Sequence, residues 1–268
     1  MTEPLSISEI INLDQYPIEG DTAARSTLLA GLKADLDQNQ YCALPDFFRP
    51  AALQQVVAEA NANRHLANDN NSHRNCYFEQ VINPDLPVNH PRNMMLKTGN
   101  RMLGYGHVPQ GSPVRTFYHW PEVRRMVAEI VGSTELFENE DPWQPANILC
   151  YEPGDLSAWH FDSTNAFTMT LMMQSADEGG DFELVPNTRT DTDQNYDYVR
   201  RVLIGQQDQD IVPVGRDPGA LCIFRGCNSM HRVSQVMGNT MRIMGVFVYE
   251  DKPGVVGDPV VNATVYGV

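Results

Sequence analysis

The pattern of hydrophobic residues changes about halfway along the chain. In the first half, apolar residues recur every three or four positions, which is the period of an amphipathic helix. Helices are predicted there over residues 21–36, 50–62 and 121–132. Asp21 or Thr22 could cap the first helix, and Pro121 and Gly132 suit the start and the end of the third. The aromatic run YCALPDFF at 41–48 predicts a short strand.

The second half of the chain predicts strands. Short apolar or alternating runs are separated by Gly, Pro, Asp and Asn, and several such strands at modest spacing favour a sandwich or a barrel. The runs are ANILCYE, AFTMTLMMQ, GDFELVP, GALCIF and RIMGVFVYE. The polar segment 186–218 predicts an insertion with a helix from Tyr196 to Leu203. The stretch 71–112, rich in Asn, Pro and Gly, is long enough to cover a site.

Composition and charge narrow the class of protein. A chain of 268 residues that is 42% hydrophobic favours one globular domain and excludes collagen-like, coiled-coil and disordered classes. The formal net charge of −15 makes nucleic acid and anionic membranes unfavourable partners. Five cysteines without close spacing predict reduced thiols. Because the N-terminus is acidic and no long apolar window follows, we expect a cytoplasmic protein. A homodimer is left open.

The candidate chemistry begins with His160 and Asp162. If these residues are extended, side chains two positions apart share a face of the strand, so imidazole and carboxylate converge. About one such His-x-acid pair is expected by chance in a chain of this composition, so the pair needs context. His231 follows in a later strand-like run, and Arg242 opens the last one. Two His and one carboxylate on a β scaffold make a facial triad, which leaves three adjacent positions on an octahedral Fe(II).

Arg242 is expected inside the barrel. It begins an alternating run, so it shares a face with Met244 and Val246. A buried Arg requires an anionic partner, and its planar fork can bind a carboxylate in a bidentate manner that Lys cannot reproduce. A structural pairing of Arg242 with one of the many acidic residues is the alternative, just as His160 and His231 could be hydrogen-bonded core histidines.

The order of Tyr151, Gly154, His160, Asp162, His231 and Arg242 resembles that of the 2-oxoglutarate- and Fe(II)-dependent dioxygenases. Their motif is His-x-Asp, a distant His, and then a basic residue that grips the far carboxylate of the cosubstrate. The resemblance implies that His160, Asp162 and His231 bind Fe(II) and that Arg242 binds 2-oxoglutarate, with hydrogen bonds from Tyr151 and Thr170. Molecular oxygen is the second cosubstrate of this superfamily.

The resemblance also implies a fold, a mainly β double-stranded β-helix, or jelly roll (cupin-like), with N-terminal supporting helices. Residues 1–143 would supply helical support and lid loops, and residues 144–254 the core with the metal site, within a single domain over 1–268.

The branch that contains amino-acid halogenases and their hydroxylating relatives is the most similar. The similarity is carried by EGGDFELVPNTR, NYDYV, HRVSQVMGNTMR and YEDKPG. Halogenases of this type have Gly or Ala at the carboxylate position, which admits chloride, whereas this chain has Asp162. The resemblance therefore implies hydroxylation of an unactivated C–H bond in a small polar metabolite, a free amino acid or a derivative, in specialised metabolism.

Several alternatives remain at this point. The same iron chemistry could give desaturation or ring closure, the substrate could be a protein side chain or a carrier-tethered group, or the jelly roll could be a non-catalytic binding module. For a free amino acid, Arg74, Arg92 and Arg101 are candidate partners of the substrate carboxylate. Trp159, beside the first predicted ligand, is a candidate wall of the pocket.

Overall fold

A computed structural model describes residues 4–162, 166–215 and 217–268. The helices of this part of the chain are α1 (Ile7–Ile10), α2 (Ala23–Asn39), α3 (Pro50–Asn63), α4 (Pro113–His119), α5 (Pro121–Val131), α6 (Tyr196–Leu203) and α7 (Pro259–Tyr266). Short 3₁₀ helices lie at Arg64–Leu66, Pro91–Asn93, Tyr105–His107 and Asp208–Asp210. None of the helices in these ranges is long and apolar enough to cross a membrane.

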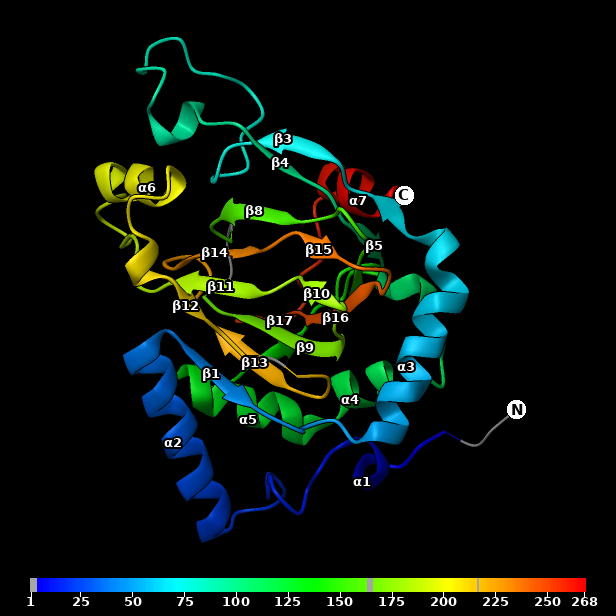
Figure 1. The fold of residues 1–268 in the computed structure, drawn as a ribbon. Helices are drawn as coiled ribbons and strands as arrows, with labels where there is room; N and C mark the ends of the chain where they lie inside the picture. The colour runs from blue at the N-terminus through cyan, green and yellow to red at the C-terminus, as the bar shows by residue number, and fades with distance from the viewer. Residues whose placement is uncertain (1–3, 163–165, 216) are drawn as a thin grey trace.

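Two antiparallel sheets form the body of the molecule (Figure 1). The larger contains, in order, β1 (Tyr41–Leu44), β13 (Leu221–Phe224), β9 (Thr168–Gln174), β16 (Arg242–Phe247), β7 (Ala146–Tyr151), β5 (Arg101–Leu103) and β2 (Asn68–Asp69). The smaller contains β12 (Val212–Pro213), β11 (Phe182–Val185), β14 (Met230–Val233) and β8 (Ser157–His160). Two-stranded pairs join β10 (Glu178–Gly179) to β15 (Val236–Met237), β17 (Tyr249–Glu250) to β6 (Phe137–Glu138), and β3 (Ser72–Arg74) to β4 (Leu96–Thr98).

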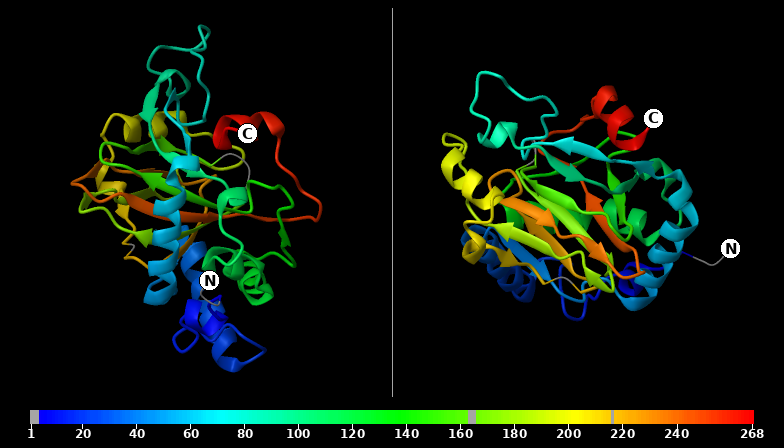
Figure 2. Two further views of the ribbon diagram at one scale, coloured as in Figure 1. Left: turned by 90° about the vertical axis from the view of Figure 1, so that its right-hand side faces the viewer. Right: turned by 45° about the horizontal axis from the view of Figure 1, so that its top comes forward.

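The two sheets face each other, and N-terminal helices cover the outside of the larger one. A cluster of Leu149, Phe182, Leu184, Phe224 and Met244 joins the inner faces of both sheets. Helices α2, α4 and α5 lie against the outer face of the larger sheet, and Figure 2 shows them on one side of the strands. The predicted jelly roll with N-terminal supporting helices is confirmed.

The predicted helices form for the expected local reasons. The Thr22 hydroxyl accepts a hydrogen bond from the backbone N–H of Arg25 at 3.1 Å, which satisfies a free donor at the start of α2. Helix α5 ends at Gly132, whose φ of 78° is the left-handed conformation that glycine adopts without strain. Helix α6 in the insertion has the predicted bounds.

Three strands of the N-terminal half enter the larger sheet, so this half gives more than helical support. The predicted strand over 41–48 is shorter in the structure, because only Tyr41–Leu44 pairs with β13. The sequence pattern did not indicate β2, β5 or helix α7. No disulfide joins the five cysteines in the described ranges, and four of the five side chains are buried.

Candidate metal centre

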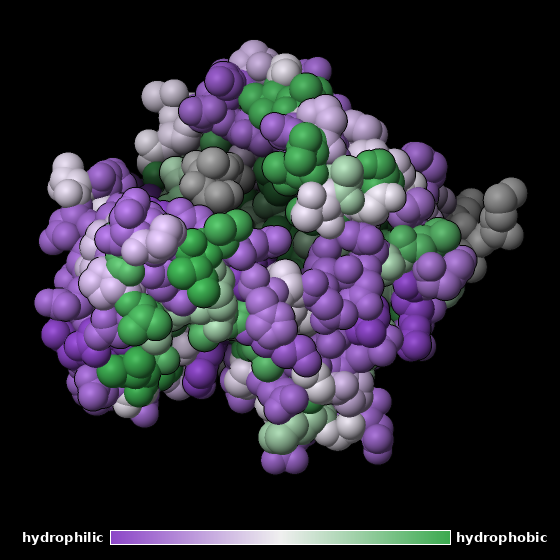
Figure 3. All heavy atoms as spheres, turned by 90° about the horizontal axis from the view of Figure 1, so that it is seen from above, coloured by the Kyte–Doolittle hydropathy of each residue, from purple (hydrophilic) through white to green (hydrophobic). Residues whose placement is uncertain are grey.

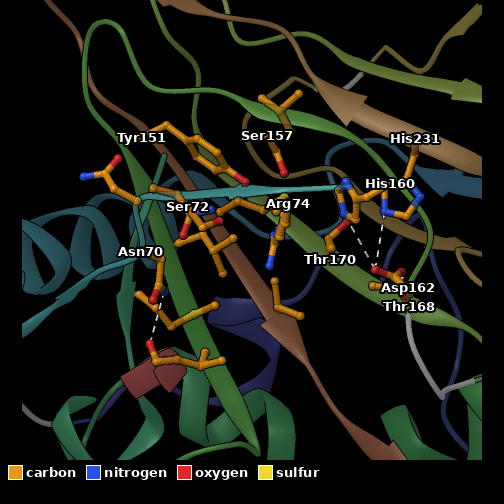
Figure 4. Close-up of a pocket in the computed structure, with 18 of the residues that line it drawn as sticks. Asn70, Ser72, Arg74, Tyr151, Ser157, His160, Asp162, Thr168, Thr170 and His231 are labelled. Carbon is orange, nitrogen blue, oxygen red and sulfur yellow. Dashed lines mark hydrogen bonds and ion pairs between the residues drawn. The ribbon is translucent and has the colours of Figure 1, made fainter. Parts of the chain in front are cut away.

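His160, Asp162 and His231 come together between the two sheets (Figure 4). His160 ends β8 and lies directly opposite His231 on the neighbouring strand β14, while Asp162 follows two residues after His160. The Oδ1 atom of Asp162 is 3.4 Å from Nε2 of His231 and 3.9 Å from Nε2 of His160. The predicted convergence of the His-x-Asp pair on one point is therefore seen in the structure.

Backbone carbonyls orient both imidazoles. Nδ1 of His160 lies 2.7 Å from the carbonyl oxygen of Ala158, and Nδ1 of His231 lies 3.0 Å from that of Ser229. Each ring can donate its Nδ1–H to that carbonyl, which leaves the Nε2 lone pair free for a ligand. Burial, reinforced by the neighbouring His231, lowers the pKa of His160 to about 3, so the ring is unprotonated near neutral pH.

The Asp162 side chain is ionised, and its neighbours pack closely around it. Burial raises its pKa, but attraction to His231 and His160 and the hydrogen bond donated by the Thr168 hydroxyl outweigh that effect and hold the pKa below its usual range. Its backbone N–H donates to the carbonyl of Gly226 at 3.0 Å. A Cβ atom at Gly226 would lie 1.9 Å from Asp162 Oδ2, so a side chain there would displace the carboxylate.

The donor set fits a ferrous ion. One atom from each of the three residues lies within 4.8 Å of the other two, a spacing that one metal ion can bridge. Two neutral imidazoles and one carboxylate compensate one charge of a divalent ion and leave coordination positions open, which is the facial triad of non-haem iron oxygenases. No group of three or more His, Cys, Asp or Glu elsewhere in the described ranges has this spacing.

The three residues line a cavity of about 360 Å³. Seen from above in Figure 3, the molecule is hollowed near the centre of this face. Polar residues from several elements share the lining, namely Asn70, Ser72, Arg74, Ser157, Thr168 and Thr170. The C-terminal helix α7 adds Thr264 and Val265 to one wall, where the Asn70 amide donates to the Val265 carbonyl at 3.1 Å.

Tyr151 and Arg242 are direct neighbours in the larger sheet, whereas Thr170 lies further along β16. Arg242 is opposite Tyr151 in the pairing of β16 with β7, and Thr170 is opposite Val246 in the pairing of β9 with β16. The Arg242 side chain is fully buried, with its guanidinium carbon 5.2 Å from the centre of the Tyr151 ring. Tyr151 and Thr170 line the cavity, and Arg242 lies behind Tyr151 and Met244.

Arg74 on β3 is the one predicted substrate cation that the structure brings to the cavity. Arg92 instead forms an ion pair with Glu79 and donates from Nε to the Tyr196 hydroxyl at 3.2 Å. Arg101 pairs with Asp155 at 2.7 Å between Nη1 and Oδ2. These partners hold both guanidinium groups away from the cavity, which corrects their assignment as substrate residues.

Trp159 also points away from the cavity. It alternates with His160 along β8, so its ring faces outward, into a cluster with Phe161 and residues of α6. The Arg232 guanidinium lies 4.7 Å from the centre of the Trp159 ring on the same outer face. The prediction that Trp159 forms a wall of the pocket is therefore corrected.

Sequence reasoning missed two residues that hold the carboxylate, Thr168 and Gly226. Thr168 looks like an ordinary strand residue, and its contact with Asp162 arises only because β9 passes beside the end of β8 in the fold. Gly226 stands in a turn between two predicted strands, where glycine usually serves backbone geometry alone.

A jelly roll with an inward-facing His-x-Asp pair and a distant His defines the class of 2-oxoglutarate/Fe(II) oxygenases. The chain belongs to the Halogenase D family, whose sequence profile matches residues 24–258. No curated protein matches the chain.

Solved structures share the fold. The epimerase SnoN in complex with Fe³⁺, alpha ketoglutarate and nogalamycin RO aligns with a TM-score of 0.56 at 17% identity, over 87% of this chain and 93% of that one. The carbocyclase SnoK aligns at 0.55 and 13% identity, over 86% and 87%. A prolyl hydroxylase from Trichoplax adhaerens, in complex with a peptide fragment, aligns at 0.54 and 14% identity, over 87% and 95%. The predicted superfamily, and with it an oxygenase of the Fe(II)- and 2-oxoglutarate-using class, is confirmed.

Proposed function

We propose that this protein hydroxylates an unactivated C–H bond of a small polar metabolite, a free amino acid or a derivative of one, using Fe(II), 2-oxoglutarate and O₂. The observation that carries the proposal is the complete triad facing the cavity, with Asp162 present and ionised. Five cysteines with no disulfide among them favour a reducing compartment and support a cytoplasmic location.

Each residue of the site has a role that follows from its side-chain chemistry. Nε2 of His160, Nε2 of His231 and a carboxylate oxygen of Asp162 hold Fe(II). When bound, Fe(II) would activate O₂, which is the oxidant, and 2-oxoglutarate would supply two of the electrons as it is converted to succinate and CO₂. Arg242 anchors the far carboxylate of 2-oxoglutarate through a charge-assisted contact, and Tyr151 and Thr170 donate hydrogen bonds to the same molecule.

Asp162 favours hydroxylation over halogenation. Its carboxylate occupies the position that chloride would need, and Thr168 and the backbone of Gly226 hold it there. We expect Asp162→Gly to abolish hydroxylation. Chloride added to this variant tests whether the opened position accepts a halide, by the mass of the product.

The substrate proposal rests on Arg74. In the described ranges no carboxylate lies within ion-pairing distance of its guanidinium, and burial lowers the pKa of this side chain, so binding an anion there would relieve an unfavourable environment. Arg74 lies between Tyr151 and the triad (Figure 4). An acidic group bound at Arg74 places the rest of a small metabolite next to the proposed metal position.

The test is anaerobic loading with Fe(II) and 2-oxoglutarate, addition of single amino acids, and exposure to O₂. We expect one amino acid to stimulate succinate formation and to gain the mass of one oxygen atom. His160→Ala should form no succinate, whereas His65→Ala, at an exposed residue outside the site, should match the wild type. A product that has lost two hydrogens would replace hydroxylation with desaturation, and a wild type that forms no succinate would refute the proposal.

A further inference from the structure

The turn after β3 places an aromatic residue in a conformation that L-residues rarely adopt. Phe78 has a φ of 68°, in the left-handed region. The other non-glycine residues with positive φ in the described ranges are Gln40, Asp46, Asn187 and Asn195, which are all polar. A bulky aromatic side chain there is a strained exception, and such strain persists only where the surroundings impose it.

A single buried side chain imposes the turn. Asn75 is 1% exposed, and its Oδ1 accepts the backbone N–H groups of Tyr77 at 2.9 Å and Glu79 at 3.1 Å. Its Nδ2 donates to Glu79 Oε2 at 2.8 Å and to the Arg92 carbonyl at 2.6 Å. The backbone N–H of Phe78 donates to the Asn75 carbonyl at 3.0 Å. The Asn75 amide thus closes this turn through three hydrogen bonds and ties it to the segment at Arg92 through the fourth.

The turn is also attached to the strand that carries the first triad residue. The carbonyl of Cys76 accepts the backbone N–H of Phe161 at 3.0 Å, between His160 and Asp162 in the chain. The Tyr77 ring lies on the Phe161 ring with centres 5.5 Å apart. The position of Phe78 is therefore fixed relative to His160.

The Phe78 ring contacts two groups that face the cavity. Its centre is 5.4 Å from that of the His160 ring, and the Arg74 guanidinium carbon is 4.2 Å from the Phe78 centre. An Arg over an aromatic face at this distance forms a cation–π contact. A flexible side chain such as Arg74 would otherwise sample many rotamers, so the ring restricts it without using any of its N–H donors.

We infer that Phe78 is a positioning residue, which holds the Arg74 guanidinium beside the triad so that its donors stay free for the acidic group of the substrate. The inference rests on the proposed function for the identity of that group. It adds a specificity element, since the distance from Arg74 to His160 would fix how far the oxidised carbon lies from the substrate's acid. The strained turn keeps the Phe78 ring in contact with both Arg74 and His160.

The experiment compares Phe78→Gly with Phe78→Tyr. Glycine accepts the positive φ and removes the ring, so the turn should form without its strain, whereas tyrosine keeps the ring and serves as the matched control. Circular dichroism and the melting temperature check that both variants fold. Arginine-labelled, metal-free protein is titrated with acetate, and the Nε–H signal of Arg74, assigned with Arg74→Lys, is followed by NMR.

We expect the wild type and Phe78→Tyr to show the same acetate response at Arg74. Phe78→Gly should bind acetate about fivefold more weakly, the loss expected for one cation–π contact, and its Arg74 signal should become that of a mobile side chain. The inference is overturned if acetate does not shift the Arg74 signal in the wild type, or if the shift in Phe78→Gly equals that in the wild type. Succinate formation is measured on a second portion of the same wild-type preparation, loaded with Fe(II) and 2-oxoglutarate. A failure of the proposed oxygenase activity appears in that portion, and the acetate response of Arg74 is interpreted separately.

Discussion

The two faces of the larger sheet are built from the same strands and differ in almost every property. On β9, Met169, Leu171 and Met173 point outward into the core beneath the helices, whereas Thr168 and Thr170 point inward to the cavity. The outer face packs against aromatic side chains, with the Phe117 and Phe247 rings 4.8 Å apart, whereas the inner face carries threonine hydroxyls and faces the two imidazoles of the smaller sheet. Alternation along one strand therefore separates the residues that stabilise the fold from those that face the site.

Close packing sets the outer face apart as well. A Cβ atom at Gly245 would lie 2.7 Å from Cε of Met173 and 3.2 Å from the Phe247 ring, so an added carbon in this layer would force its neighbours to shift. The inner face instead leaves a cavity of about 360 Å³. Substitutions on the two faces should therefore give different experimental signatures.

The largest effect is expected from His231→Ala, on the smaller sheet directly across the cavity from that inner face. It removes one of three donors, so Fe(II) affinity should fall by more than the roughly 10- to 100-fold that loss of an outer-shell partner causes. Succinate formation should become undetectable, and the urea midpoint should not fall. Anaerobic equilibrium dialysis with Fe(II) measures the first quantity, and His65→Ala is the control. Unchanged iron binding would remove His231 from the metal centre.

On the outer face, Leu171→Ala should cost about 2–5 kcal/mol of unfolding free energy, since it leaves a cavity in a layer that is fully buried. Urea denaturation measures this loss. The apparent KM for 2-oxoglutarate should stay within twofold of the wild type, because the side chain faces away from the cavity. A large change in KM with little change in stability would reverse the roles given to the two faces.

Arg242→Lys should raise the apparent KM for 2-oxoglutarate by about 10- to 100-fold, since Lys keeps the charge but loses the planar pair of donors, a change of roughly 1.5–3 kcal/mol. Initial rates of succinate formation at varied 2-oxoglutarate check it. Arg232→Lys is the matched control, because Arg232 lies over Trp159 on the outer face of the smaller sheet. Equal effects of the two substitutions would argue against Arg242 as the anchor.

Thr170→Val should have the smallest effect of the series, a two- to tenfold rise in the same KM, which corresponds to the loss of one hydrogen bond of about 0.5–1.5 kcal/mol. The substitution keeps the size and the branching of the side chain, so the urea midpoint should change little. A KM identical to that of the wild type would show that Thr170 does not bind 2-oxoglutarate.

The structural features that could be predicted from the sequence are those with a local signal. The period of the apolar residues predicted α2, α3 and α5, and the spacing of His160 and Asp162 on a strand predicted their convergence. The inward direction of Arg242 followed from alternation along its strand, and its full burial agrees with that.

The remaining features depend on contacts between distant segments. Arg74, Arg92 and Arg101 look alike in the sequence, and only the positions of Glu79 and Asp155 in the fold decide which guanidinium is left for the cavity. The contact of Thr168 with Asp162 and the α7 wall likewise arise from the folded arrangement. Pairing across a sheet has no signature in a short window of sequence.

Anomalous diffraction from crystals soaked anaerobically with Fe(II) and 2-oxoglutarate tests the central claim most directly. We expect one strong iron peak within bonding distance of Nε2 of His160, Nε2 of His231 and a carboxylate oxygen of Asp162. A triad without a peak, or iron bound at another group of side chains, would contradict it.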